Sequence, residues 1–129
     1  MVNRERVNAV AVLILRAAQN GDTVSFSSLY SLFDRSTPRS DMHRILEAAC
    51  SQLAPWRDAI YSAVMARKHT GCPGSGFFDT YSIHRRDEYK RIAGGMIHVT
   101  ELSVSQQQQI TELERVRVYA HADKYAGFL

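Results

Sequence analysis

The segment HTGCPGSG, residues 69–76, contains the residues whose types most suggest chemistry. Cys72 lies three positions after His69, and a thiolate paired with an imidazole is a nucleophile. Two residues at this spacing in a turn are not held for proton transfer, and no Asn or Asp is placed to orient the histidine. The sequence therefore predicts no catalytic residue in this segment.

Glycines in the same segment raise the question of phosphate binding. Gly71, Gly74 and Gly76 do not form a dinucleotide-binding pattern, which must follow a strand and open a helix, because Gly76 leads into Phe77 and Phe78. A Walker loop is excluded because no Gly-Lys-Ser or Gly-Lys-Thr follows. A long hairpin loop with glycine and proline at its turn positions is the simplest interpretation. A nest of backbone amides that binds phosphate is the alternative.

The segment HRRDEYKR, which begins at His84, is the densest polar cluster. Its Asp87 and Glu88 invite comparison with nuclease sites that hold a metal, but such sites need further ligands at a matching interval. His98 and Glu101 are the nearest candidates, and their interval does not match. A solvated charged turn is the favoured interpretation, and no metal site is predicted.

Cysteine usage gives no support for a cofactor. Cys50 and Cys72 are the only cysteines, and neither belongs to a Cys-x-x-Cys pair. A disulfide framework and a structural zinc site therefore lack sequence support, and both side chains are expected to be free thiols. Cys50 lies in an apolar pattern and is expected to pack in the core.

The composition is that of one ordinary globular domain. The chain has 129 residues, 45% of them hydrophobic and 22% charged, with a formal net charge of +3 that permits nucleic-acid binding without requiring it. A chain of this length can bury a core without metal or disulfide support, so a single domain, 1–129, is expected. No apolar run reaches the ~18 residues that cross a bilayer, and the N-terminal MVNRERVNAV is charged where a signal peptide is apolar. We therefore expect a cytoplasmic protein with no membrane partner.

The first half of the chain predicts three helices. Apolar residues recur at helical spacing from Arg4 to Asn20, and a glycine follows as the stop. Thr23–Ser25 predicts a short extended segment, and a second helix is expected at about Ser27–Phe33 with a serine cap. Pro38 suits the first turn of a third helix, which ends before the next proline. The apolar stripe of this third helix consists of Met42, Ile45, Leu46, Ala49, Cys50 and Leu53.

The second half predicts a β-hairpin and a terminal helix. Side chains alternate along Ile60–Arg67 and, in part, along Phe77–Ile83, which indicates two strands joined by the glycine-rich loop. The charged segment after them indicates one helical turn that ends at residues 94–95. Ser103 and Gln106 fit a capping box for the terminal helix. The apolar stripe expected on that helix consists of Ile110, Leu113, Val116 and Ala120.

This order of elements predicts the class α+β, as a mainly helical, winged-helix-like domain with one β-hairpin and a C-terminal helix. In such a fold the third helix enters the major groove of DNA, and the hairpin forms a wing that touches the backbone or the minor groove. The polar side of the third helix and the basic residues near the hairpin offer donors to phosphates and base edges. A solvated helix face is the alternative interpretation. The candidate nucleic-acid-binding residues are Arg39, Ser40, His43, Arg44, Arg67, Lys68, His69, Arg85 and Arg86.

Three segments, TVSFSSLYSLF, SDMHRILEAA and APWRDAIYSAVMARKHTG, resemble the DNA-binding half of alkyltransferase-like proteins. The shared features span about Thr23–Gly71 and comprise a turn-helix-helix, a Pro-Trp dipeptide before a short strand, and a glycine turn. The Pro-Cys-His-Arg nucleophile motif of the alkyltransferases is absent, because Pro55, Trp56, Arg57 and Asp58 occupy that region. The resemblance implies a related helical layout without alkyl transfer. ARKHTGCPGSGFF and TELERVRVYA also resemble segments of small bacterial proteins, which implies no mechanism.

Together these patterns predict a non-enzymatic nucleic-acid-binding or regulatory module. Double-stranded DNA is the expected partner. A second copy of the chain is also expected, bound through the first helix, around which Val12, Leu13 and Leu15 extend the apolar surface, or through the terminal helix. The alternative function is a protein-interaction or inhibitor module of a mobile element that acts through apolar helix and hairpin surfaces. No cofactor and no enzyme activity are predicted.

Overall fold

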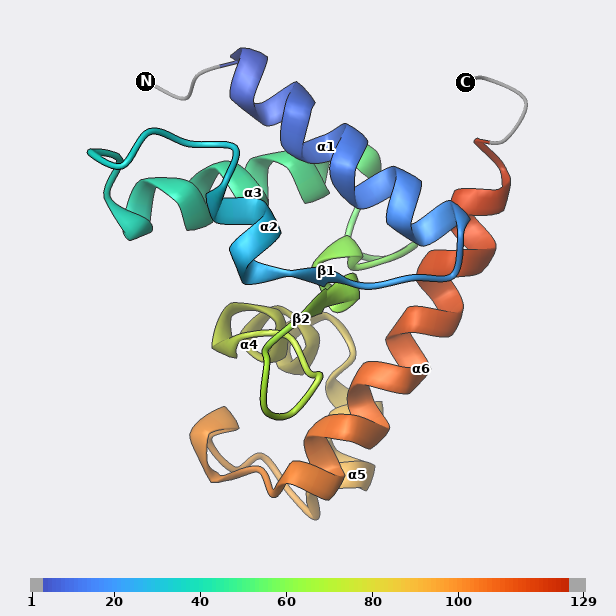
Figure 1. Cartoon of the computed structure of the whole chain (residues 1–129). Helices are drawn as coiled ribbons and strands as arrows, with labels where there is room; N and C mark the ends of the chain where they lie inside the picture. The colour runs from blue at the N-terminus through green and yellow to red at the C-terminus, as the bar shows by residue number, and fades with distance from the viewer. Residues whose placement is uncertain (1–3, 126–129) are drawn as a thin grey trace.

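The structure, a computed structural model, describes residues 4–125, so the two ends of the expected domain, 1–3 and 126–129, lie outside the description. Helices dominate, and α6 runs along one side of the molecule from α1 to α5 (Figure 1). No helix within residues 4–125 combines the length and the apolar composition needed to span a membrane. In chain order the elements are α1 (Arg4–Gln19), β1 (Val24–Ser25), α2 (Phe26–Tyr30), α3 (Arg39–Leu53), η1 (Tyr61–Val64, a 3-10 helix), β2 (Met65–Ala66), α4 (Ser75–His84), α5 (Arg86–Ala93), η2 (Val99–Glu101, a 3-10 helix) and α6 (Val104–Asp123).

The three helices predicted in the first half of the chain are confirmed, with small shifts at their ends. The Ser25 side chain caps α2 by accepting a hydrogen bond from the Ser28 N–H at 3.1 Å. Every residue of the stripe predicted for α3 is buried, and α3 packs against α1, whose Val10 and Ile14 are also buried. All of these residues except Met42 belong to one hydrophobic cluster that extends through the chain to α6. The observed class is thus mainly helical with a small β component, in agreement with the predicted α+β class.

The only sheet in the described part of the chain is the parallel pair of β1 and β2. Val24 lies opposite Met65, and Ser25 lies opposite Ala66. Parallel strands need a crossover connection, which α2 and α3 provide here. The pairing therefore holds the start of α2 beside the segment that leads into the glycine-rich loop.

The predicted β-hairpin is wrong. Its first strand, Ile60–Arg67, forms η1 and only the two residues of β2, and its second, Phe77–Ile83, lies within α4. Phe77, Phe78 and Tyr81 are buried at positions i, i+1 and i+4, which is the spacing of a helix face and not of a strand. The glycine-rich loop therefore joins a strand to a helix, and residues 4–125 contain no β-hairpin that could act as a wing.

The charged segment after α4 forms α5, a helix of 8 residues, where the sequence predicted one turn. Its predicted stop is correct, because Gly94 follows the helix in the left-handed conformation with φ of 81°, which costs glycine little. Asp87 and Glu88 occupy the first turn, where the positive end of the helix dipole favours acidic side chains.

The terminal helix, α6, begins as predicted but buries a different face. The Ser103 side chain accepts from the Gln106 N–H at 3.0 Å, and the Gln106 side chain accepts from the Ser103 N–H at 2.8 Å, which completes the capping box. Of the predicted apolar stripe only Ile110 is buried, and Val116 is 68% exposed. The positions of α6 that are buried are Ile110, Thr111, Glu114, Val118 and Ala122.

A buried carboxylate accounts for the rotated face of α6. Glu114 is 0% exposed, and its Oε1 accepts from Arg85 Nε at 2.8 Å and from Arg117 Nη1 at 2.9 Å. Its Oε2 accepts from Arg85 Nη2 at 3.0 Å and from the Ile60 N–H at 2.9 Å. A carboxylate away from water needs charged partners and hydrogen bonds, and these donors supply both. Glu114 thereby joins α6 to the segment before η1 and to the junction of α4 and α5.

Replacement of Glu114 by alanine is expected to lower the free energy of unfolding by about 3–5 kcal/mol, because Arg85 and the Ile60 N–H would stay buried without their acceptor. Urea denaturation followed by circular dichroism measures the change. The matched control is Glu112→Ala, an exposed position on the same helix, which is expected to change the value by less than about 0.5 kcal/mol. Similar effects of the two substitutions would contradict this role of Glu114.

Candidate functional site

The outer face of α3 carries four of the candidate nucleic-acid-binding residues. Arg39, Ser40, His43 and Arg44 are exposed and share the side of the helix opposite its buried stripe. The Arg44 side chain is 67% exposed, and its 3.8 Å contact with Asp41 is a surface pair of small energy. All four side chains are therefore accessible to a ligand in solution.

Aromatic residues of α2 hold two of these side chains in place. The guanidinium carbon of Arg39 lies 3.9 Å from the centroid of the Tyr30 ring, a cation–π contact. The Tyr30 hydroxyl and His43 Nε2 share a hydrogen bond of 3.0 Å. The His43 ring also stacks on Phe26, with ring centroids 5.7 Å apart. These contacts restrict the rotamers of Arg39 and His43 in the free protein.

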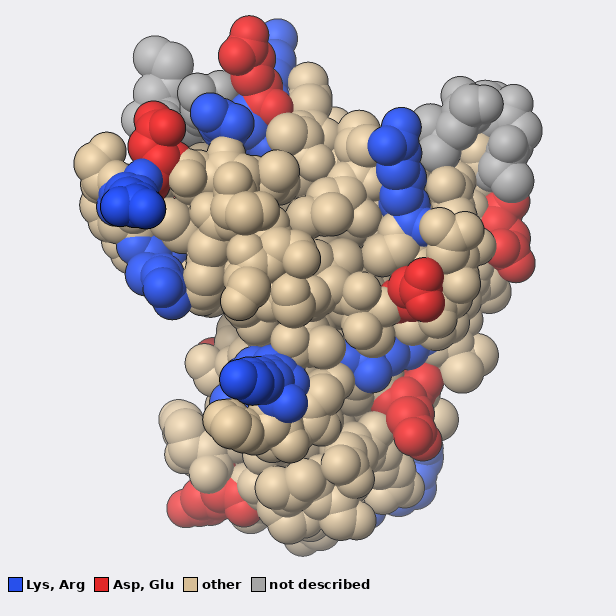
Figure 2. All heavy atoms as spheres, viewed as in Figure 1, with Lys and Arg blue, Asp and Glu red and all other residues tan. Residues whose placement is uncertain are grey.

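The charge on this surface is mixed. On α3 itself, the negative charges of Asp41 and Glu47 offset the positive charges of Arg39 and Arg44. Figure 2 shows Lys and Arg side chains separated by acidic and uncharged surface, with no continuous basic patch on the face in view. Attraction for a polyanion would therefore come from a few contacts and not from a broad positive field.

Arg67, Lys68 and His69 are exposed in the loop between β2 and α4. The Arg67 Nη2 donates to Gln107 Oε1 at 3.0 Å, so this side chain is directed toward α6. The sequence predicts these residues at the wing of a hairpin. The structure places them on a loop that leads into a helix, with their exposure intact.

Arg115 of α6 fixes the path of this loop. Its Nε donates to the Ala63 carbonyl at 2.7 Å, and its Nη2 donates to the carbonyls of Met65 and Gly71 at 3.1 and 2.8 Å. Burial lowers the pKa of Arg115. Gly71, with φ of 70°, adopts the left-handed conformation that favours glycine. The loop is thus joined to α6 through the backbone carbonyl of Gly71 as well as through the Arg67 side chain.

Arg85 is not available to a ligand, which corrects its assignment as a nucleic-acid-binding residue. Its side chain is 12% exposed and pairs with Glu114. Its guanidinium also donates to the carbonyls of Trp56 and Arg57 at 3.1 and 3.3 Å. Arg86 is exposed, but it begins α5, which lies toward the opposite end of the molecule from α3 (Figure 1).

Glu88 and Arg117 extend the buried charge cluster toward the surface. Arg117 donates to both carboxylate oxygens of Glu88, at 3.0 and 2.6 Å, and the Tyr81 hydroxyl donates to the same group. The hydrogen bonds from Arg117 outweigh burial and lower the pKa of Glu88. The polar segment that begins at His84 is therefore not the solvated turn that the sequence indicated, because Arg85 and Glu88 belong to this cluster.

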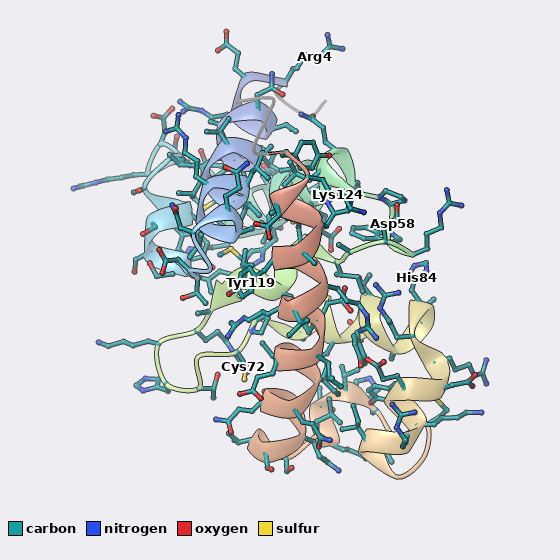
Figure 3. All side chains as sticks on the ribbon, turned by 90° about the vertical axis from the view of Figure 1, so that its right-hand side faces the viewer. Arg4, Asp58, Cys72, His84, Tyr119 and Lys124 are labelled. Carbon is teal, nitrogen blue, oxygen red and sulfur yellow. The ribbon has the colours of Figure 1, made fainter. Side chains whose placement is uncertain are left out.

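His84 and Cys72 lie apart from any catalytic arrangement. Figure 3 shows His84 at the end of α4, and its ring lies 6.2 Å from the Trp56 ring. Cys72 is 1% exposed, and Figure 3 shows it beside α6. The structure gives no contact between Cys72 and the exposed His69, so the thiol–imidazole pair considered from the sequence does not form within residues 4–125.

A pocket between α2, α3 and α4 is the feature that the sequence analysis missed. It contains about 470 Å³ of space free of protein atoms, part of which is open to solvent. Phe26, Trp56 and Phe77 supply aromatic lining, and Leu46 and Met65 supply aliphatic lining. Because these residues come from five separate segments, no local motif in the sequence signals the pocket.

Four polar side chains, His43, Glu47, Ser62 and Thr80, also line the pocket. Glu47 is the only lining residue with a formal charge, and no described Lys or Arg takes part. Within residues 4–125, neither the Glu47 carboxylate nor the Ser62 hydroxyl has a hydrogen-bond or ion-pair partner. Cys50 completes this wall, and burial raises its pKa to about 12, so the thiol is neutral and unreactive near pH 7.

The described residues bring no three His, Cys, Asp or Glu side chains together as metal ligands. Comparisons with protein-family models, with curated proteins and with solved structures found no match for this chain. The resemblance to alkyltransferase-like proteins therefore stays a prediction that depends on the quoted segments alone.

Acid is expected to destabilise the protein in part through Glu88. Folding lowers the pKa of this group below its ordinary value of 4.5, so its ionised form stabilises the fold above pH 4.5. This contribution is lost as the pH falls through the lower pKa of the folded state. Glu88→Gln is therefore expected to be less stable than the parent near pH 7, with a difference that shrinks below pH 4.5.

Urea denaturation at about pH 7 and about pH 3 measures this difference at constant salt. The control is Glu112→Gln, an exposed carboxylate on α6, for which little difference is expected at either pH. A destabilisation by Glu88→Gln that is the same at both pH values would rule out the proposed linkage.

Proposed function

We propose that the chain is a non-enzymatic nucleic-acid-binding or regulatory module that contacts double-stranded DNA through α3. The observation that carries this proposal is the exposed set Arg39, Ser40, His43 and Arg44 on one face of the N-terminal half of α3. In helix-turn-helix proteins the N-terminal residues of the contact helix meet base edges. Arginine suits this role because its planar fork pairs with guanine and with phosphate.

The free protein already holds part of this face in position, which supports the proposal. The contacts of Tyr30 with Arg39 and His43 reduce the conformational entropy that binding would remove. Ser40 lies in the first turn of α3, whose N-cap residue, Pro38, makes no side-chain cap. The free N–H groups and the positive dipole of this end favour a phosphate.

The loop that carries Arg67, Lys68 and His69 supplies further cationic contacts in this proposal. It replaces the wing of the winged-helix layout, since the predicted hairpin is absent from the described residues. Arg85 and Arg86 have no part, because one is buried and the other lies on α5. With few exposed cations near α3, we expect contacts with a small number of phosphates and a correspondingly modest dependence on salt.

The test is fluorescence anisotropy of labelled duplex DNA across a range of salt concentrations. The double variant Arg39→Ala with Arg44→Ala is expected to weaken binding and to reduce the slope of log K against log salt by about 2, because two phosphate or base contacts are lost. The matched control is Arg86→Ala with Lys90→Ala, which removes two exposed cations from α5 and should leave affinity and slope nearly unchanged. Equal losses in both double variants would mean non-specific attraction and would remove α3 from the proposal.

A protein-interaction or inhibitor module, of the kind carried by mobile elements, is the second candidate. The observation that favours it is the exposure of Leu113, Val116 and Ala120, which form a stripe on the outer side of α6. No duplex binding at low salt, combined with self-association that Val116→Glu abolishes in sedimentation experiments, would favour this candidate over the first.

A further inference from the structure

We infer that the pocket between α2, α3 and α4 binds a flat organic cation, such as an aromatic amidinium or a protonated amine, with Glu47 as its counter-charge. This inference is independent of the proposed nucleic-acid contact. It concerns the edge of α3 that faces α2 and α4, where the exposed His43 and Glu47 line the pocket, whereas the nucleic-acid proposal depends chiefly on Arg39 and Arg44.

The aromatic and aliphatic lining of the pocket favours an organic ligand over an inorganic ion. Phe26, Trp56 and Phe77 come from α2, from the segment after α3, and from α4, so aromatic surface surrounds the space from three elements. Aromatic faces carry negative charge density and attract cations, while aliphatic lining from Leu46 and Met65 favours an apolar frame. A strongly hydrated inorganic ion would lose its water here without adequate replacement.

The charge of the pocket selects the sign of the ligand. Glu47 is the one lining residue with a formal charge, and its carboxylate makes no ion pair within the described residues. No Lys or Arg among those residues lines the pocket, so an anion would meet repulsion and no counter-charge. The Cys50 thiol adds no second negative charge near neutral pH, because burial keeps it protonated.

The position of the Glu47 carboxylate suits contact with a ligand in the pocket. A Cβ added at Gly76 would lie 3.7 Å from Glu47 Oε1, so this side chain of α3 extends toward the first turn of α4. The unpartnered Ser62 hydroxyl supplies a further acceptor for a ligand N–H. A planar cation with several N–H donors matches this arrangement of one carboxylate, one hydroxyl and aromatic walls.

The size of the pocket suits a small molecule or a single side chain. Much of the 470 Å³ is open to solvent, and a water-sized sphere can be centred in only about 50 Å³ of it, which limits the ligand to one small planar group. The opening allows either a free ligand or the end of a lysine or arginine side chain from another protein to enter. Both sources present the same cationic chemistry.

Trp56 makes the test direct, because it is the only tryptophan of the chain and it lines the pocket. Benzamidine, its neutral analogue benzamide and the anion benzoate are titrated into the full-length protein without nucleic acid, and Trp56 fluorescence is followed. Benzamidine is expected to bind at least about tenfold more tightly than benzamide, because its cationic amidinium forms an ion pair with the Glu47 carboxylate whereas benzamide offers only a neutral donor. Benzoate is expected to cause no saturable change.

Two variants test whether benzamidine binds in this pocket. Glu47→Gln is expected to remove the preference for benzamidine over benzamide, whereas the control Glu112→Gln, on the exposed side of α6, should keep it. Gly76→Leu is expected to abolish binding of both probes, since its φ is not positive and a leucine there extends toward Glu47. Circular dichroism confirms that each variant is folded. Equal affinity for the two probes in the parent protein, an unchanged preference in Glu47→Gln, or no saturable binding of benzamidine would overturn the inference.

Competition with peptides identifies the source of the cation once benzamidine binding is established. The probes are the blocked tripeptides Gly-Lys-Gly and Gly-Arg-Gly. Displacement of benzamidine by either peptide would assign the site to a protein side chain, and its absence would assign the site to a free small molecule. Because no nucleic acid is present, failure of this experiment leaves the proposed role of the outer face of α3 unaffected.

Discussion

The buried carboxylate of Glu114 is the constraint on which the rest of the structure depends. Two arginines and one backbone N–H meet on this group, and they come from α6, from the α4–α5 junction and from the segment before η1. Apolar packing alone would allow several rotations of a long helix, whereas a buried charge tolerates only the orientation that brings it to its donors. The orientation of α6 then decides where its other side chains lie. Arg117 reaches Glu88 and Arg115 reaches the loop after β2 because Glu114 faces inward.

Much of the fold could be predicted from the sequence where local signals and burial agree. The stripe of α3, the capping box of α6 and the glycine stop of α5 are correct because each depends on neighbours along the chain. The predictions are wrong where a residue distant in the sequence determines which side chains are buried. A glutamate on a helix normally faces water, so a face containing Glu114 was not counted as the buried one. The segment Phe77–Ile83 has aromatic residues that suit a strand, yet their spacing buries them together on α4.

The two sides of α3 illustrate the same limit for the candidate site. Its outer face was predictable, because helical spacing alone separates Arg39, His43 and Arg44 from the buried stripe. The pocket at its edge was not, because its walls come from segments that are distant in the sequence and are brought together by the parallel pairing of β1 with β2 and by the packing of α4. Arg85 was misassigned for a related reason: a basic residue between two helices has no sequence feature that distinguishes an internal ion pair from an exposed cation. His43 takes part in both surfaces, since it contacts Tyr30 outside and lines the pocket.

The guanidinium of Arg115 donates to main-chain oxygens alone, at Ala63 in η1, Met65 in β2 and Gly71 in the loop after β2. Every amino acid presents the same carbonyl, so the anchor is indifferent to side-chain identity at most positions of the loop. Lys68 and His69 are therefore free to vary without a change in the course of the chain. A surface of this kind can acquire a new charge or a new hydrogen-bonding pattern by single substitutions, on a scaffold that stays the same. Substitutions at exposed positions of this loop would therefore leave its course unchanged, whereas a substitution of Arg115 would remove the hydrogen bonds that hold it.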